Sequence, residues 1–230
     1  MTGPVRETYL DWNATTPLRP AAAAAMQAAM AHCGNPSSVH RWGRAARQAV
    51  ESSREAVAGL VGMPSSGIVF TSGGTEANHL ALIGSARDRV LVSAVEHNSV
   101  LQAVPDAAHL PVDGHGLVDI ARLNVLLAAE TRPALVSVMM ANNETGIIQP
   151  IAEIADIAHA SGALVHCDMI QAAGKIPIAA AALGADLVSL SAHKIGGPPG
   201  IGAVVVRNGI ELVPLLRGGG QERGRRAGSE

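Results

Sequence analysis

The sequence predicts a three-layer α/β/α fold, in which helices cover both faces of a mostly parallel sheet. Short apolar runs alternate with segments of helical periodicity from residue 68 onward, which is typical of strands joined by crossover helices. Residues 187–190 and 203–206 are almost wholly apolar, as expected for strands buried on both faces. With 230 residues, of which 48% are hydrophobic, the chain can bury a large core. We expect an N-terminal arm at residues 1–20 and one large domain at residues 21–230.

The first part of the chain is predicted to contain an extended arm and two helices. Residues 8–12 favour an extended conformation, and residues 13–17 favour a turn. The Ala-rich residues 20–32 favour a helix that a proline opens. After a loop at residues 34–38, residues 41–61 carry apolar side chains at helical spacing, and their charged side chains are expected on the exposed face.

Strands and helices are expected to alternate over the rest of the chain. In an open, mostly parallel sheet, ligands bind beyond the carboxyl ends of the strands. The expected strands are residues 68–70, 90–95, 134–141, 164–168, 187–190 and 203–206, with a short extended piece at 110–112, and the expected helices are residues 77–86, 99–107, 119–129 and 151–161.

Polar side chains gather at the ends of the predicted strands. Each cluster has an ordinary explanation by itself, since strand-end loops are polar and a lone His or Asp there usually caps a helix. Five such clusters at one edge of a sheet favour a ligand site. The clusters are residues 72–76, Glu96 with His97, residues 142–144, Asp168 with Gln171, and residues 191–194.

Lys194 follows an apolar strand and precedes a turn rich in Gly and Pro. Burial of an unpaired ammonium group is costly and lowers the lysine pKa, so a lysine at this place is expected to have a partner or a covalent role. The covalent role typical of lysine is a Schiff base with a carbonyl group. The alternative is a lysine whose ammonium group extends from the strand end into solvent.

The Gly73-Gly74-Thr75 turn follows a predicted strand and opens a helix. Free backbone N–H groups and the positive end of the helix dipole suit a phosphate, and the hydroxyl of Thr75 adds a donor. The turn lacks the Gly-Lys-Ser/Thr of a Walker loop and the glycine spacing of a dinucleotide fingerprint. The sequence therefore indicates a phosphate site of another kind.

Two further side chains suit an aromatic cofactor ring. Asp168, at the end of the predicted strand 164–168, can pair with a protonated pyridine nitrogen, the contact that makes a pyridoxal ring an electron sink. His97 has an aromatic face for stacking and is a residue type suited to proton transfer. Together with Lys194 and the phosphate turn, these residues predict pyridoxal 5'-phosphate (PLP) as the cofactor.

Composition and charge argue against several other functions. The net charge of −2 and the pI near 6.5 provide no general attraction to nucleic acid or to an anionic membrane. Cys33 and Cys167 are far apart, without disulfide or metal-site spacing, which fits a reducing cytoplasm. The N-terminus has no apolar signal core, and the Ala-rich residues 21–31 are too few to cross a bilayer. We expect a cytoplasmic protein without a metal site that binds neither nucleic acid nor membrane.

A series of segments, in order along nearly the whole chain, carries a resemblance to a known family. The sequence resembles the cysteine desulfurases, which are class V aminotransferases among the fold-type-I PLP enzymes. The segments are residues 11–17 (DWNATTP), 34–40 (GNPSSVH), 70–78 (FTSGGTEAN), 96–97 (EH), 142–146 (NNETG), 166–168 (HCD) with Gln171, 191–194 (SAHK) and 218–229 (GGGQERGRRAGS).

The resemblance implies a role for each matching residue. Lys194 is implied to hold the cofactor as a Schiff base, Asp168 to pair with the pyridinium nitrogen, and His97 to stack on the ring. Gln171 is implied to bind the ring hydroxyl, and Asn143 to line the cofactor and substrate site. The residues implied to bind the phosphate are Gly74, Thr75, Ser191, His193 and, from the other subunit, Ser229.

The same resemblance implies a reaction and partners. Cysteine desulfurases convert L-cysteine to L-alanine and transfer the sulfur to an enzyme thiol as a persulfide, for iron–sulfur cluster assembly or other sulfur transfer. The implied partners are L-cysteine, a second copy of the chain in a homodimer, and a sulfur-acceptor or scaffold protein.

The sequence also departs from this family. Relatives continue into a smaller C-terminal domain that holds the nucleophilic cysteine and an arginine for the substrate carboxylate, and neither is expected in these 230 residues. Cys167 is expected to be buried and inert, and Cys33 is expected not to reach the cofactor. We therefore expect cofactor binding with little turnover. The alternatives are a related lyase such as a selenocysteine lyase, an inactive cofactor-binding fragment, and a nucleic-acid-binding tail at residues 218–229.

Overall fold

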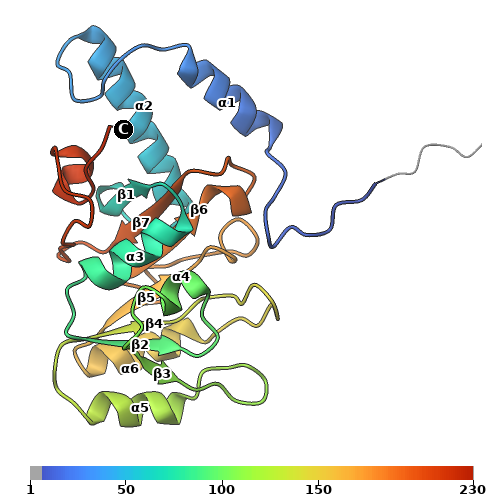
Figure 1. Cartoon of the computed structure of the whole chain (residues 1–230), viewed down its shortest axis with the longest axis vertical. Helices are drawn as coiled ribbons and strands as arrows, with labels where there is room; N and C mark the ends of the chain where they lie inside the picture. Colours follow the sequence, from blue (N-terminus) through green and yellow to red (C-terminus); the bar gives the residue numbers. More distant parts are fainter. Residues whose placement is uncertain (1–6, 230) are drawn as a thin grey trace, which may run out of the picture.

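The computed structural model describes residues 7–229 and contains a seven-stranded sheet with helices on both faces (Figure 1), so the predicted α/β fold is confirmed. Residues 1–6 of the expected arm lie outside the described residues. The helices are α1 (Pro20–Met30), α2 (Arg41–Val61), α3 (Gly74–Gly84), α4 (Asn98–Leu101), α5 (Ile120–Ala128) and α6 (Ile151–Ala160). The strands are β1 (Ile68–Thr71), β2 (Arg89–Ser93), β3 (Ala108–Leu110), β4 (Ala134–Ser137), β5 (Leu164–Asp168), β6 (Leu187–Ser191) and β7 (Gly202–Val206).

The strand order in the sheet is β1-β7-β6-β5-β4-β2-β3. Strand β7 is antiparallel to both of its neighbours, and the other pairs are parallel. Strand β1 therefore runs in the same direction as β6, and the carboxyl ends of β1, β4, β5 and β6 lie at one edge of the sheet. The connections that carry the predicted polar clusters begin at this edge.

Two apolar cores flank the sheet. Helices α2, α5 and α6 pack on one face through fully buried side chains such as Val61, Leu123 and Ile154. Helices α3 and α4 cover the other face, where Leu80 and Val100 are fully buried. Strands β4, β5 and β6 are buried at every residue, which explains why their sequences are mostly apolar without a regular alternation of apolar and polar residues.

Most predicted elements lie within a few residues of the observed ones, and two are shorter. The helix predicted at residues 99–107 ends at Leu101, because Pro105 has no N–H donor and disfavours helical geometry in the residue before it. The strand predicted at residues 134–141 ends at Ser137, although the Val138 N–H still bonds to β5.

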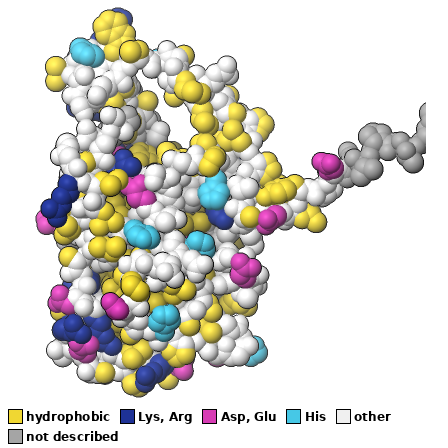
Figure 2. All heavy atoms as spheres, viewed as in Figure 1, with side chains coloured by type: hydrophobic (Ala, Val, Ile, Leu, Met, Phe, Trp, Pro, Cys, Tyr) yellow, Lys and Arg dark blue, Asp and Glu magenta, His cyan; other side chains and the backbone are white. Residues whose placement is uncertain are grey.

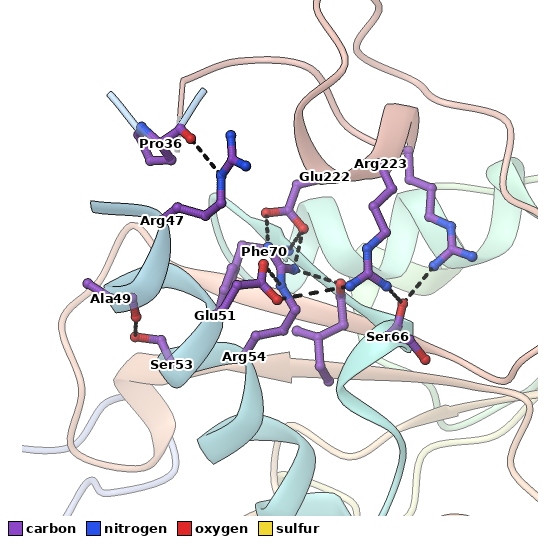
Figure 3. Close-up of polar contacts among 12 residues, drawn as sticks. Pro36, Arg47, Ala49, Glu51, Ser53, Arg54, Ser66, Phe70, Glu222 and Arg223 are labelled. Carbon is purple, nitrogen blue, oxygen red and sulfur yellow. Dashed lines mark hydrogen bonds and ion pairs between the residues drawn. The ribbon is translucent and has the colours of Figure 1, made fainter. Parts of the chain in front are cut away.

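Arg54 contradicts the expectation that the charged side chains of α2 lie on its exposed face. It is only 3% exposed, and its Nη1 donates to Glu222 at 2.7 Å and to the Ile68 carbonyl at 2.8 Å. Its guanidinium group also lies over the Phe70 ring, with 5.0 Å from Cζ to the ring centroid (Figure 3). Burial is tolerated because Glu222, from far along the chain, neutralises the charge.

The Arg54–Glu222 pair leads to a stability prediction. Glu222→Gln is expected to lower the free energy of unfolding by about 3 kcal/mol, because it leaves the buried Arg54 charge uncompensated. Glu51→Gln is the matched control, since Glu51 pairs with the same guanidinium at 3.1 Å from an exposed position, and the expected loss is under about 1 kcal/mol. Urea unfolding measures both values. Equal losses in the two variants would contradict the prediction.

Candidate active site

A cavity of about 590 Å³ lies at the carboxyl edge of the sheet. Residues Asp11, Asn13 and Ala14 of the N-terminal arm form part of its wall. Nine of the ten predicted site residues line this cavity, and they are Gly74, Thr75, His97, Asn143, Asp168, Gln171, Ser191, His193 and Lys194. The tenth, Ser229, lines a separate cavity of about 500 Å³ beside α2 and β1.

The N-terminus of α3 lies at this cavity. Gly74 and Thr75 begin the helix, and they also line a smaller cavity of about 250 Å³ together with Ser191 and His193. The first N–H groups of a helix have no partner within the helix, so an anion can accept hydrogen bonds from them. Gly202 in β7 allows the loop before α3 to pack this closely, because a Cβ at Gly202 would lie 2.6 Å from that loop's backbone.

Asp168 ends β5 and lines the cavity with a buried carboxylate. One oxygen accepts a hydrogen bond from Asn78 Nδ2 and the other from the Ile170 N–H, both at 2.9 Å. Burial raises the pKa of Asp168 despite these two hydrogen bonds. Among the described residues, no Lys or Arg forms an ion pair with this carboxylate. A cationic ligand such as a protonated pyridine would therefore stabilise its charged form.

Glu96 is a second buried carboxyl near Asp168. One of its oxygens accepts the Met139 N–H at 2.5 Å, and the other has no hydrogen-bond partner within residues 7–229. Burial and the Asp168 charge raise the pKa of Glu96 well above its usual range. Glu96 does not line the cavity, where Asp168 is joined by the carboxyl groups of Asp11 and Glu144.

A hydrogen-bonded chain connects His97 to Asp168. The His97 Nδ1 accepts the Ser99 N–H at 3.1 Å and lies 2.8 Å from the Ser99 hydroxyl. That hydroxyl accepts from Asn78 Nδ2 at 2.8 Å, and the same amide donates to Asp168. Because Nδ1 accepts a backbone N–H, we assign the imidazole proton to Nε2. Asn78 and Ser99 therefore hold the two predicted side chains in place.

Lys194 follows β6 in a single 3-10 turn, Ala192–Lys194, and its amine is held at the cavity by the N-terminal arm. The amine donates hydrogen bonds to the backbone carbonyls of Asn13, at 2.5 Å, and Ala14, at 2.9 Å. Burial lowers the pKa of Lys194, against the opposing effect of the Asp11 and Asp168 charges. A lowered pKa increases the fraction of neutral, nucleophilic amine at neutral pH.

Asn13 is a site residue that the sequence analysis did not single out. Its backbone carbonyl also accepts from Gln171 Nε2 at 2.9 Å, and its side chain accepts from Lys175 Nζ at 3.0 Å and donates to the Asn143 carbonyl at 3.0 Å. These partners lie at least 130 residues away in sequence. The polar turn at residues 13–17 was visible in the sequence, but nothing in it indicated that the arm would reach the cavity.

Neither cysteine lines the cavity, and we expect different reactivity from the two. Cys33 is exposed, whereas Cys167 is fully buried in β5, where burial and then the charges of Asp168 and Glu96 raise its pKa well above the usual range. Iodoacetamide is expected to alkylate only Cys33 in the folded chain, and both cysteines after unfolding in guanidinium chloride. Peptide mass spectrometry measures the labelling. Equal native labelling of Cys167 would show that its thiol is accessible.

The fold and the site together define the class of protein. A lysine, a buried carboxylate and a helix N-terminus surround one cavity at the edge of a mostly parallel sheet, which is the arrangement of an α/β enzyme that binds an anionic cofactor. The chain belongs to the class-V aminotransferase family, whose profile matches residues 8–226. Enzymes of this family use PLP. Within the described residues, no helix is long and apolar enough to cross a membrane.

Cysteine desulfurases are among the relatives. The chain is 43% identical over 239 residues to cysteine desulfurase IscS of Dictyoglomus turgidum, covering 98% of this chain and 60% of that protein. A NifS-like protein from Rickettsia africae superposes with a TM-score of 0.92 at 39% identity, covering 96% of this chain and 64% of that one. The structure described as SspA in complex with cysteine superposes with a TM-score of 0.91 at 32% identity. The match covers 97% of this chain and 69% of that one.

These comparisons confirm the resemblance to the cysteine desulfurases. The chain spans about 60% of the length of the curated relatives it matches.

Proposed function

We propose that the chain is the cofactor-binding part of a PLP-dependent cysteine desulfurase. The reaction is L-cysteine plus a thiol giving L-alanine plus a persulfide, for iron–sulfur cluster assembly or other sulfur transfer. In this proposal residues 1–20 are an N-terminal arm, of which Asp11, Asn13 and Ala14 line the site, and residues 21–230 are the large domain. The observation that carries the proposal is the convergence of Lys194, Asp168 and the α3 N-terminus on one cavity.

The residues of the cavity fit PLP on chemical grounds. The α3 N-terminus, with Thr75, Ser191 and His193, offers donors for a phosphate. The buried Asp168 carboxylate lacks a cationic partner among the described residues, which suits a protonated ring nitrogen. Lys194 presents an amine of lowered pKa to a carbonyl group.

Each side chain has a distinct task in the proposed reaction. When bound, PLP supplies an electron sink for cleavage of the cysteine C–S bond. Lys194 would be the residue that holds the cofactor covalently until the substrate amine binds, and Asp168 would keep the ring nitrogen protonated. His97 would stack on the ring, and with its Nδ1 accepting the Ser99 N–H it would carry a transferable proton on Nε2.

Two residues of the proposal are held by the N-terminal arm rather than by the sheet. Gln171, assigned to the ring hydroxyl, now donates to the Asn13 carbonyl, and Asn143 accepts from the Asn13 side chain. Asn13 therefore positions both of them together with Lys194. A shift of the arm would therefore move Gln171, Asn143 and Lys194 together, and change the contact that each is proposed to make with the cofactor.

The acceptor thiol comes from outside the described residues in this proposal. Sulfur transfer needs a thiolate within attack distance of the substrate sulfur, and neither Cys33 nor Cys167 lines the cavity. We propose that a homodimer forms, which would give Ser229 a role at the partner's phosphate. Large exposed apolar side chains on α1 and α2, including Met30 and Trp42, support such an interface, and hydrophobic side chains are visible along α1 in Figure 2. A cytoplasmic location and a separate sulfur-acceptor protein complete the proposal.

The test supplies the missing thiol from solution. The purified chain, loaded with PLP, is incubated with L-cysteine and dithiothreitol, and alanine and pyruvate are measured by chromatography. Slow formation of alanine, absent when PLP is omitted, is the expected result. Pyruvate without alanine would indicate elimination instead of sulfur transfer to a thiol, and a chain that does not bind PLP would overturn the proposal altogether.

A further inference from the structure

Glu76 places a carboxylate in the first turn of α3, beside the residues that the proposed function assigns to the phosphate. Its Oε2 accepts the Ser72 N–H at 2.6 Å, which closes the loop before the helix. Its Oε1 accepts from Arg226 Nε at 2.9 Å, and Arg226 Nη2 lies 3.4 Å from Oε2. Burial opposes ionisation of Glu76, but the hydrogen bonds from Arg226 and Ser72 prevail and lower its pKa. The residue is therefore charged at neutral pH.

Arg226 reaches Glu76 from the Gly/Arg segment, which we define as residues 218–229. This segment is fixed to the sheet at a second point, because Glu222 accepts hydrogen bonds from the Phe70 N–H at 2.9 Å and from the buried Arg54 (Figure 3). Glu222 and Arg223 have φ values of 46° and 58°, a conformation that side chains other than glycine rarely adopt. The turn at residues 221–224 is thus held by its contacts, and Arg226 follows from that anchored turn.

The position of Glu76 creates an electrostatic problem for an anionic ligand. Glu76 lines the 250 Å³ cavity together with Gly74, Thr75, Ser191 and His193, the residues proposed to bind the phosphate. A carboxylate in a first helical turn is stabilised by the helix dipole, but it repels a phosphate bound at the same N-terminus. The guanidinium group of Arg226 is the cation that pairs with Glu76, and both side chains are largely shielded from solvent.

We propose that Arg226 is a positioning residue for the phosphate site, because its pairing with Glu76 holds the Ser72–Glu76 loop and cancels a charge that would otherwise repel the phosphate. This inference rests on the proposed function. If the inference holds, the affinity of the site for the phosphate depends on the contact between Arg226 of the Gly/Arg segment and Glu76 of α3. The two members of the ion pair line different cavities, since Glu76 lines the phosphate cavity and Arg226 lines the second cavity together with Ser229.

The test compares PLP with pyridoxal, which has the same ring and aldehyde but no phosphate. Dissociation constants for both are measured from the absorbance change on binding to the full chain.

Arg226→Gln is expected to weaken PLP binding about tenfold and to leave pyridoxal binding unchanged, because only the phosphate would be repelled by the unpaired Glu76 carboxylate. Arg226→Lys restores a positive charge and is expected to recover most of the PLP affinity. Glu76→Gln combined with Arg226→Gln removes both charges and is expected to recover it as well.

Arg223→Gln is the matched control in the same segment. Arg223 donates to the Ser66 carbonyl and does not line the phosphate cavity, so its removal is expected to change neither dissociation constant (Figure 3). Equal weakening of PLP and pyridoxal by Arg226→Gln would overturn the inference and assign Arg226 a purely structural role. Unchanged PLP affinity in that variant would overturn it too. Failure of the unmodified chain to bind either compound would instead overturn the proposed function.

Discussion

Lys194→Ala is expected to abolish the covalent attachment of PLP that borohydride reduction produces in the unmodified chain. The Lys194 amine lines the cavity, and burial lowers its pKa, so the nucleophilic form is more abundant than for an exposed lysine. The chain has only two lysines, Lys175 and Lys194, which leaves few places for a reduced adduct. Peptide mass spectrometry after reduction is expected to find the added mass on Lys194 alone.

Lys175 is the matched control for this experiment. Its amine lies near the same cavity, donates to the Asn13 side chain, and also has a pKa lowered by burial and by the charge of Lys194. Lys175→Ala is therefore expected to retain full attachment at Lys194. Attachment to Lys175 in the unmodified chain, or undiminished attachment in Lys194→Ala, would contradict the assignment of Lys194.

Asp168→Asn is expected to slow alanine formation from L-cysteine by about 100-fold or more. A neutral amide cannot hold the ring nitrogen protonated, and the charge-assisted hydrogen bond is lost at a buried position. The new side chain keeps the size of the old one, and its one oxygen can accept either from Asn78 or from the Ile170 N–H, so the fold is expected to persist. The measurement is the rate per bound PLP, with dithiothreitol as the acceptor thiol.

Asp186→Asn is the control for loss of a buried aspartate in the same sheet. Asp186 is fully buried, accepts the Val165 N–H and pairs with Arg207, away from the cavity. It is expected to lower stability while leaving the rate per bound PLP near that of the unmodified chain. If Asp168→Asn retained a comparable rate, Asp168 would not be the partner of the ring nitrogen.

The parts of the site that the sequence predicted lie where local pattern determines position. Lys194 and Asp168 follow apolar runs, and Gly74 follows a strand and begins a helix, so each could be placed at a strand end from its neighbours alone. Parallel pairing then brings these ends to one edge of the sheet. Local pattern also placed Gln171 and Asn143 in the polar clusters at strand ends, and the resemblance to the cysteine desulfurases assigned their roles and added Ser229.

The residues that sequence reasoning missed depend on partners far along the chain. Asn13 contacts Lys194 across 181 residues, and Arg54 contacts Glu222 across 168. Helical periodicity places Arg54 on the polar face of α2. Only the folded chain shows that Glu222 covers this position and pairs with the buried guanidinium group. Asn78 is similar, because an Asn inside a helix has no signal that it bridges Ser99 and Asp168.

Strand β7 determines the order in which a growing chain can fold. Strands β2 to β6 find their neighbours progressively as synthesis proceeds, whereas β1 is an edge strand whose neighbour in the described sheet is β7, with Ile68 opposite Val205. Such a long-range pairing is slow, and it cannot begin until β7 has left the ribosome. Since β1 leads directly into the Gly73 loop and α3, we expect nascent chains to assemble the carboxylate side of the pocket before its anion-binding side.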